Sequence, residues 1–228
     1  MSPVGTLNEK PLHAALKRAY AVPGDRLEAP VGRYVVDILR GREIIEIQTR
    51  NFSAVKGKVL DLIVQHDLVL VSPVAVDKRI VKLPPGDGET ATARRSPKHG
   101  LVVDVFDELV SFPQLVAHPR FSLEVALISE EEVRRWDPKR AWRRRGWVID
   151  HRRLVDIVDR VRLSCVGDLA DLLPTELVEP FTTADLAAAL GRPRRLAQRM
   201  AFCLRGAGAI DPVGKAGNAV RYARVAVD

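Results

Sequence analysis

Cysteine is scarce in this sequence: only two are present among 228 residues, Cys165 and Cys203, and they stand far apart. No CxxC pair and no histidine at metal-ligand spacing accompanies them, so neither a zinc site nor a disulfide framework is expected. Both are interpreted as small core residues. No apolar run approaches the roughly 18 residues of a membrane span. The N-terminus also lacks a basic stretch followed by an apolar core, and the sequence therefore predicts a cytoplasmic protein without a membrane segment.

Negative charge is in short supply, with 29 Asp/Glu against 36 Lys/Arg and a net charge of +7. Two segments carry the excess. Residues 134–153 contain nine Lys/Arg and two Asp, and residues 181–228 contain eight Lys/Arg and three Asp. A polyanionic partner, DNA above all, is favoured by this distribution. The hydrophobic content of 46% is that of a globular protein rather than a disordered one.

The first part of the chain alternates helix and strand patterns. Residues 8–20 place apolar side chains at helical spacing and predict a helix. Three runs rich in β-branched residues then predict a meander of strands, at residues 27–31, 34–40 and 43–49. The Gly-Arg pairs between these runs, which begin at Gly32 and Gly41, fit two-residue type II′ turns. A helix over residues 53–65 and a buried strand over residues 67–76 are expected next.

The rest of the chain is less regular until its last quarter. Residues 84–100 break every periodicity and predict a loop, and residues 101–163 mix helical and strand-like pieces without a firm fold. A Thr-x-x-Asp capping box at Thr182 and Asp185 then opens a helix that ends at Gly191. A basic amphipathic helix and a glycine-rich hairpin follow.

The two-residue turns fix which residues of the meander lie opposite each other. Counting from the second turn places Asp37 opposite Glu46, and counting from the first turn places Glu28 opposite Asp37. Like charges about 5 Å apart repel by roughly 3 kcal/mol at an effective dielectric of about 20, so compensating positive charge is expected. Mg²⁺, or Mn²⁺ in its place, would supply it through these carboxylates. The alternative is ordinary ion pairing at a strand edge, with Arg33, Arg40 or Arg42.

The helix, the pattern D37-x8-E46-x-Q48 on consecutive strands, and the following helix and strand resemble the core of the PD-(D/E)XK nuclease superfamily over residues 8–80. The resemblance implies a restriction-endonuclease-like α/β (α+β) fold, a mixed sheet flanked by helices, and Mg²⁺-dependent hydrolysis of DNA. Gln48 stands where the superfamily has its lysine. In some members glutamine remains there or the lysine moves to the next helix, which here carries Lys56 and Lys58. The catalytic residues implied are Asp37, Glu46, Gln48 and Lys58, with Glu28 as a further metal ligand.

Residues 165–228 resemble a winged helix-turn-helix domain, whose second helix enters the DNA major groove. The DNA-binding residues implied are Arg192, Arg194, Arg195, Gln198 and Arg199 on that helix, and Lys215, Asn218 and Arg221 on the wing. The buried side of the helix is predicted to consist of Leu196, Met200, Phe202 and Leu204. The alternative is a basic, solvated helix in a module that contacts proteins.

A further basic run, KRAWRRRGW at residues 139–147, interleaves Trp142 and Trp147 with arginine. It suits phosphate contact or base stacking, and packing of the tryptophans beneath arginine stems is the alternative.

These patterns divide the chain into a nuclease-like core (1–83), a loop and extension (84–163) and a winged domain (164–228). The predicted function is a Mg²⁺-dependent DNA endonuclease. A catalytically inactive, nuclease-like DNA-binding protein or transcription regulator is the main alternative, and a protein-interaction module without a nucleic-acid role is a third. A homodimer is compatible with the resemblance, but the sequence indicates no dimer surface.

Overall fold

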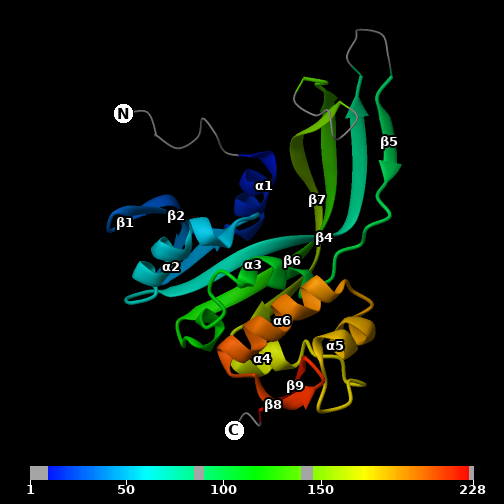
Figure 1. Ribbon diagram of the computed structural model, residues 1–228. Coiled ribbons are helices and arrows are strands. Elements are labelled where there is room, and N and C mark those ends of the chain that lie inside the picture. The colour runs from blue at the N-terminus through cyan, green and yellow to red at the C-terminus, as the bar shows by residue number, and fades with distance from the viewer. Residues whose placement is uncertain (1–9, 85–89, 140–145, 226–228) are drawn as a thin grey trace.

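The computed structural model of the protein describes residues 10–84, 90–139 and 146–225. It is a mixed α/β structure in which a 7-stranded sheet, with both parallel and antiparallel pairs, is flanked by helices (Figure 1). The predicted class, a mixed sheet flanked by helices, is confirmed. No helix in the described ranges is both long and apolar enough to cross a membrane.

The large sheet has the strand order β1-β2-β3-β4-β6-β7, with β5 paired to β4. Its strands are β1 (Arg26–Val31), β2 (Tyr34–Arg40), β3 (Glu43–Ile47), β4 (Asp67–Leu83), β5 (Thr92–Arg95), β6 (Phe121–Trp136) and β7 (Trp147–Leu163). The helices are α1 (Pro11–Tyr20), α2 (Lys56–Leu62), α3 (Phe106–Leu109), α4 (Val166–Ala170), α5 (Thr183–Leu190) and α6 (Arg194–Ala207). Short 3₁₀ helices are η2 (Phe52–Ala54), η3 (Val102–Val105) and η4 (Leu115–Ala117), and a separate hairpin consists of β8 (Ile210–Ala216) and β9 (Ala219–Arg224).

The meander β1-β2-β3 is antiparallel throughout, as predicted. Gly32 and Gly41 have φ of 57° and 58°, whereas neither following arginine has a positive φ, which is the combination that a type II′ turn requires. The chain then crosses over through α2 and returns as β4, parallel to β3. The predicted order of helix, three-strand meander, helix and strand is therefore confirmed.

Strand β4 is buried on both faces over its first half. Leu68 and Leu70 belong to the larger core cluster, which includes residues of α2, α3 and α6. Val69 and Val71 belong to a smaller cluster on the other face, together with Leu16 of α1. Because successive side chains of a strand point to opposite faces, covering both faces requires the continuous apolar run seen in the sequence.

The larger core joins the two ends of the chain. Phe112 lies in it with its ring stacked on Phe52, at a centroid distance of 5.4 Å. Met200 of α6 is a fully buried member of the same cluster. Gly206 of α6 packs closely on Pro113, since a Cβ atom at this glycine would lie 3.0 Å from the proline Cβ. Helix α6 is thus part of the main core.

Two predictions made from local pattern differ from the structure. Residues 84–100 were predicted to form a loop, but they contain β5, which pairs antiparallel with β4 in the register Arg79↔Arg95. All four residues of β5 are exposed, so no apolar periodicity marks the strand. Cys203 is buried as predicted, but Cys165 is exposed, at the residue before α4.

The region left without a predicted fold, residues 101–163, forms η3, α3, η4 and the long strands β6 and β7. Strand β6 is parallel to β4, and β7 is antiparallel to β6. The second half of β4, the strand β5 and the paired ends of β6 and β7 extend beyond the helices as an arm (Figure 1). Charged residues dominate this arm, which explains why periodicity does not identify it.

We expect Phe112→Ala to lower the free energy of unfolding by about 3–5 kcal/mol, because it removes a ring that is 2% exposed and leaves a cavity. Chemical denaturation measures the loss. Val178→Ala, at a position that is 82% exposed, is the control and should change stability by less than about 0.5 kcal/mol. Equal effects of the two substitutions would contradict the described core.

Candidate functional site

The candidate site lies where strands β2 and β3 stop pairing. Their ladder runs from Arg40↔Glu43 to Ile38↔Ile45, and the next position opposes Asp37 and Glu46, as predicted. At that position the hydrogen-bond acceptors are the two carboxylates rather than backbone carbonyls. The Asp37 N–H donates to Glu46 Oε1 at 3.2 Å, and the Ile47 N–H donates to Asp37 Oδ2 at 2.8 Å. The two carboxylates thus lie close to each other, on neighbouring strands, just beyond the end of the ladder.

The third predicted acid is turned to another partner. The pairs Leu27↔Ile38 and Ala29↔Val36 bracket Glu28 opposite Asp37, as the turn count predicts. However, Glu28 has a positive φ of 48°, and its carboxylate forms an ion pair with Lys17 of α1. Glu28 would have to leave Lys17 to act as a metal ligand.

The basic side chains that pair with the two central acids come from the flanking helices. His13 Nε2 of α1 lies 3.2 Å from Asp37 Oδ2, and Lys58 Nζ of α2 lies 2.7 Å from Glu46 Oε2. The Lys58 ammonium also donates to the carbonyl of Val35 at 2.7 Å. Compensating charge is therefore present, as the repulsion argument required.

The arginines that were the alternative partners of these acids lie elsewhere. Arg33 pairs with Asp61, and Arg40 pairs with Asp25. Arg42 donates to a backbone carbonyl, that of Gln65, at 3.3 Å. The alternative, in which these arginines pair with Asp37 and Glu46 at a strand edge, is wrong, because each arginine contacts another group.

The two acids differ in pKa. Glu46 is 6% exposed, and this burial raises the pKa of its carboxyl to about 7; Lys58 opposes the shift and the charge of Asp37 adds to it. Burial also opposes ionisation of Asp37, but His13, the Ile47 N–H and Lys58 together hold the pKa of Asp37 below its ordinary value. At neutral pH the pair therefore holds one firmly ionised carboxylate beside one that readily binds a proton.

The helix lysine, rather than Gln48, stands at the acids. The side-chain amide of Gln48 donates to the carbonyls of Arg50 and Asn51, so it supports the loop that follows β3. Lys56 is exposed on α2. Of the residues predicted for the lysine role, Lys58 is the one that contacts Glu46.

The donor set fits a hard divalent cation in type and number. Asp37 and Glu46 offer carboxylate oxygens, and Mg²⁺ commonly takes only one or two protein carboxylates together with waters and substrate phosphate. The pKa of Glu46 is raised mainly by burial and in part by the charge of Asp37, and a cation bound between the two carboxylates would favour the ionised form of Glu46. Within the described ranges no group of three or more His, Cys, Asp or Glu residues is arranged to hold a metal, so the fit rests on this pair alone.

The C-terminal elements form as predicted. Thr182 Oγ1 accepts hydrogen bonds from the N–H groups of Ala184 and Asp185, and the Asp185 carboxylate accepts from the Thr182 N–H. Helix α5 ends at Gly191, which has a φ of 59°. Helix α6 and the hairpin β8–β9 follow in the expected order.

Three of the arginines predicted to contact DNA face the body of the protein. Arg192 pairs with Asp104 at 3.2 Å. Arg195 and Arg199 pair with Asp107 of α3 at 3.5 and 2.7 Å. Helix α6 packs against α3, so these acidic residues neutralise that flank of the helix. As placed here, the three arginines bind acidic side chains of the same chain.

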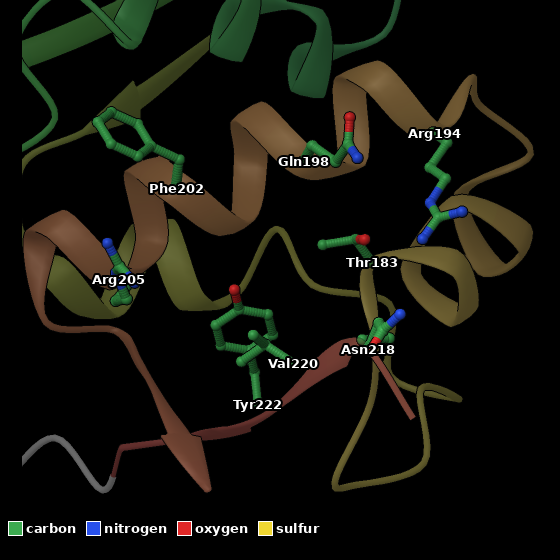
Figure 2. A pocket seen from close by; sticks show the side chains of 9 residues that line it. Thr183, Arg194, Gln198, Phe202, Arg205, Asn218, Val220 and Tyr222 are labelled. Carbon is green, nitrogen blue, oxygen red and sulfur yellow. The ribbon is translucent and has the colours of Figure 1, made fainter. Parts of the chain in front are cut away.

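The opposite flank of α6 borders an open groove of about 430 Å³ between this helix and β9 (Figure 2). Its wall on α6 consists of Arg194, Gln198, Phe202 and Arg205. Phe202 was predicted to be buried but is 49% exposed, because it follows Gln198 by one turn and precedes Arg205 by three residues on the polar stripe. Asn218 and Tyr222 lie across the groove, on the hairpin side.

The remaining predicted contacts divide between solvent and backbone. Lys215 is exposed on β8, whereas the Arg221 guanidinium donates to the Pro180 carbonyl at 3.0 Å. In the basic run at residues 139–147, Trp142 lies outside the described residues. Trp147 packs edge-on against Trp136 at 5.3 Å, and the ammonium of Lys82 lies 4.6 Å from its ring centroid.

Sequence reasoning missed His13, Lys17 and Arg205. The two α1 residues are one helical turn apart, beside the buried Leu12 and Leu16, and this spacing was visible in the sequence. Their position opposite the acids depends on how α1 crosses the sheet, which no local pattern specifies. Arg205 lies at the C-terminal end of α6, outside the helix start at which base contacts were expected.

The pKa of Glu46 predicts a pH-dependent stability difference. Its ordinary value of 4.5 rises to about 7 in the folded state, so folding binds a proton, and the associated stability is lost as pH rises through about 7. We expect Glu46→Gln to gain several degrees in melting temperature relative to the wild type between about pH 5 and about pH 8, with a chelator present.

Asp37→Asn is the matched comparison, because the lowered pKa of Asp37 gives stability that is present above its ordinary pKa of 3.8 and is lost only in stronger acid. It also removes a charge that raises the pKa of Glu46, so its destabilisation should be smaller at about pH 8 than at about pH 5. A pH-independent difference between Glu46→Gln and the wild type would contradict the raised pKa.

Comparisons with known proteins place these residues in a family. A relative from Treponema pallidum (strain Nichols), described as an uncharacterized protein, is 28% identical over 185 residues, which cover 81% of this chain and 73% of that protein. No solved structure shows a significant match. A family model described as Domain of unknown function (DUF8091) matches residues 10–164, from the start of α1 to the end of β7, and so includes the two acids and Lys58. The chain belongs to this DUF8091 family.

Proposed function

We propose that this protein is a Mg²⁺-dependent nuclease that hydrolyses phosphodiester bonds in DNA. The observation that carries the proposal is the group formed by Asp37, Glu46 and Lys58 at the end of the β2–β3 ladder. Two carboxylates on neighbouring strands with a lysine at hydrogen-bond distance are the parts that such chemistry needs.

The order of the elements supports the same proposal. Helix α1, the meander β1-β2-β3, the crossover helix α2 and the parallel strand β4 follow one another as the resemblance to PD-(D/E)XK nucleases implies. The acids lie on the second and third strands of the meander. The lysine is on the crossover helix, which is the arrangement that some members of that superfamily use.

Asp37 and Glu46 would hold the Mg²⁺, with Mn²⁺ as a substitute and Glu28 as an assisting ligand. When bound, the ion supplies Lewis acidity toward the scissile phosphate and lowers the pKa of a water molecule. Lys58 contributes positive charge at the same place, so its ammonium can stabilise the charge that develops on the phosphate oxygens. Gln48 acts as a positioning residue through the loop at residues 50–51.

The C-terminal module would supply DNA affinity through the side of α6 that faces the groove. Arg194 and Gln198 remain available there, whereas Arg192, Arg195 and Arg199 are engaged with acidic residues. We further propose that this activity is cytoplasmic.

A second candidate function is DNA binding without hydrolysis, as in a transcription regulator. It is favoured by the ion pairs of Asp37 with His13, Glu46 with Lys58 and Glu28 with Lys17, which neutralise the acids without any metal. Activity measured with Mg²⁺ and with Mn²⁺ separates the two functions.

We expect the wild type to cleave DNA with Mg²⁺ or Mn²⁺ present, and Asp37→Ala and Glu46→Ala to abolish cleavage while retaining DNA binding. Lys58→Met should lower kcat about 10²-fold or more, because it removes one charged donor from the transition state. Steady-state cleavage of labelled DNA and gel-shift binding give the two readouts.

Lys56→Met is the matched control, since Lys56 is exposed on the same helix, and its kcat should equal that of the wild type. Gln48→Ala should cost less than Lys58→Met. Absence of cleavage by the wild type with either ion, alongside intact DNA binding, would establish the regulator instead.

A further inference from the structure

The arginines at and just before helix α6 fall into two groups, those paired with acidic residues and those without an acidic partner among the described residues. Arg192, just before the helix, and Arg195 and Arg199 within it are each paired with Asp104 or Asp107. Arg194 and Arg205 are exposed and make no ion pair or side-chain hydrogen bond with the residues that the structure describes. Uncompensated positive charge thus remains only on the side of α6 that borders the groove, where it favours an anionic ligand.

The two uncompensated arginines lie at opposite ends of the groove (Figure 2). They are separated by eleven residues of helix, or about 17 Å along its axis at about 1.5 Å per residue. A ligand that meets both guanidinium groups must be elongated and must carry more than one negative charge. A strand of nucleic acid meets this condition, since every phosphate carries a charge.

Aromatic rings lie between these charges. Phe202 is 49% exposed and lines the groove on α6. Tyr222 lines it from β9, and its ring is supported from behind by Phe181, at a centroid distance of 6.2 Å. A basic groove that contains aromatic side chains is the arrangement on which the bases of a single strand stack.

Two amides complete the groove. Gln198 on α6 and Asn218 in the turn of the hairpin both line it, and neither has a side-chain hydrogen bond with another described residue. Each amide offers both a donor and an acceptor. The Watson–Crick edges of bases are open to such groups only when the strand is unpaired.

The surroundings of α6 favour a single strand over a duplex. One flank of the helix contacts α3 through the ion pair between Arg199 and Asp107, and the other flank faces the β8–β9 hairpin across the groove. A recognition helix must enter a major groove about 12 Å wide and present its N-terminal residues to base edges. A groove of about 430 Å³ is instead the size of a pocket for small planar groups.

From these observations we infer that the groove between α6 and β9 binds a single strand of nucleic acid. Bases stack on Phe202 and Tyr222, phosphates contact Arg194 and Arg205, and the two amides hydrogen-bond to base edges. This inference rests on the proposed role of the chain in nucleic-acid chemistry and specifies the form of its substrate. Binding at the groove does not require the acids at the β2–β3 ladder.

Fluorescence anisotropy with a labelled DNA strand of about 12 nucleotides tests the inference in the presence of a chelator, so that no hydrolysis occurs. The wild type should bind the strand at least about tenfold more tightly than the corresponding duplex. Phe202→Leu should weaken binding about tenfold, because leucine keeps an apolar side chain but removes the stacking face, and Phe202→Trp should retain it. Circular dichroism checks that each variant is folded.

Arg194→Gln and Arg205→Gln should each lower the slope of log affinity against log salt by about 0.7, the value for one phosphate contact on a single strand. Arg195→Gln is the matched control on the same helix and should leave the slope unchanged. Tighter binding of the duplex, an unchanged affinity in Phe202→Leu, or equal competition by polyglutamate would overturn the inference.

The outcome is separable from that of the proposed hydrolysis. Groove binding is measured with a chelator and hydrolysis with Mg²⁺, and the residues that line the groove do not include Asp37, Glu46 or Lys58. Loss of groove binding with intact cleavage would refute only the present inference, and intact binding without cleavage would refute only the proposed hydrolysis.

Discussion

Two carboxylates at the end of the β2–β3 ladder, Glu46 buried and Asp37 half-buried, constrain how the elements around them are arranged. The carboxylates of Asp37 and Glu46 accept hydrogen bonds from backbone N–H groups at the point where β2 and β3 separate. They thus replace the backbone carbonyls that accept such bonds within the ladder. Their negative charge requires positive partners, because an unpaired buried charge costs several kcal/mol. Lys58 provides such a partner for Glu46, and His13 contacts Asp37, so the two side chains connect α2 and α1 to the two strands. The same contacts bring together the only groups on which we base a hydrolytic site.

Helix α6 combines a buried side and a groove-facing side in fourteen residues. Its apolar stripe enters the main core through Met200 and Leu204. The glycine at 206 lowers helix propensity by about 1 kcal/mol relative to alanine, but it permits close packing on Pro113. Asp107 neutralises one flank, and the groove flank keeps its charge. Compensation by α3 therefore decides which arginines are available to a ligand.

Local sequence patterns succeeded where short-range physics controls the structure. The Gly-Arg turns set the register that places Asp37 opposite Glu46, and the capping box at Thr182 opens α5 as expected. Patterns failed where neighbours distant in sequence decide. Strand β5 is defined by pairing with β4, and Phe202 is exposed because the facing wall, the hairpin β8–β9, leaves a groove.

The sequence by itself determined the meander, the order of helices and strands up to β4, and the opposition of the two acids. Turn type and strand alternation depend on only a few neighbouring residues. Gly32 and Gly41, which adopt a positive φ, are sufficient to specify the two turns. Only the tertiary structure decided that Lys58 rather than Gln48 meets Glu46, and that His13 meets Asp37. It also decided that Arg195 and Arg199 of α6 pair with Asp107 of α3. Long-range charge pairing depends on how separate elements pack against one another, and no spacing within a single element encodes that geometry.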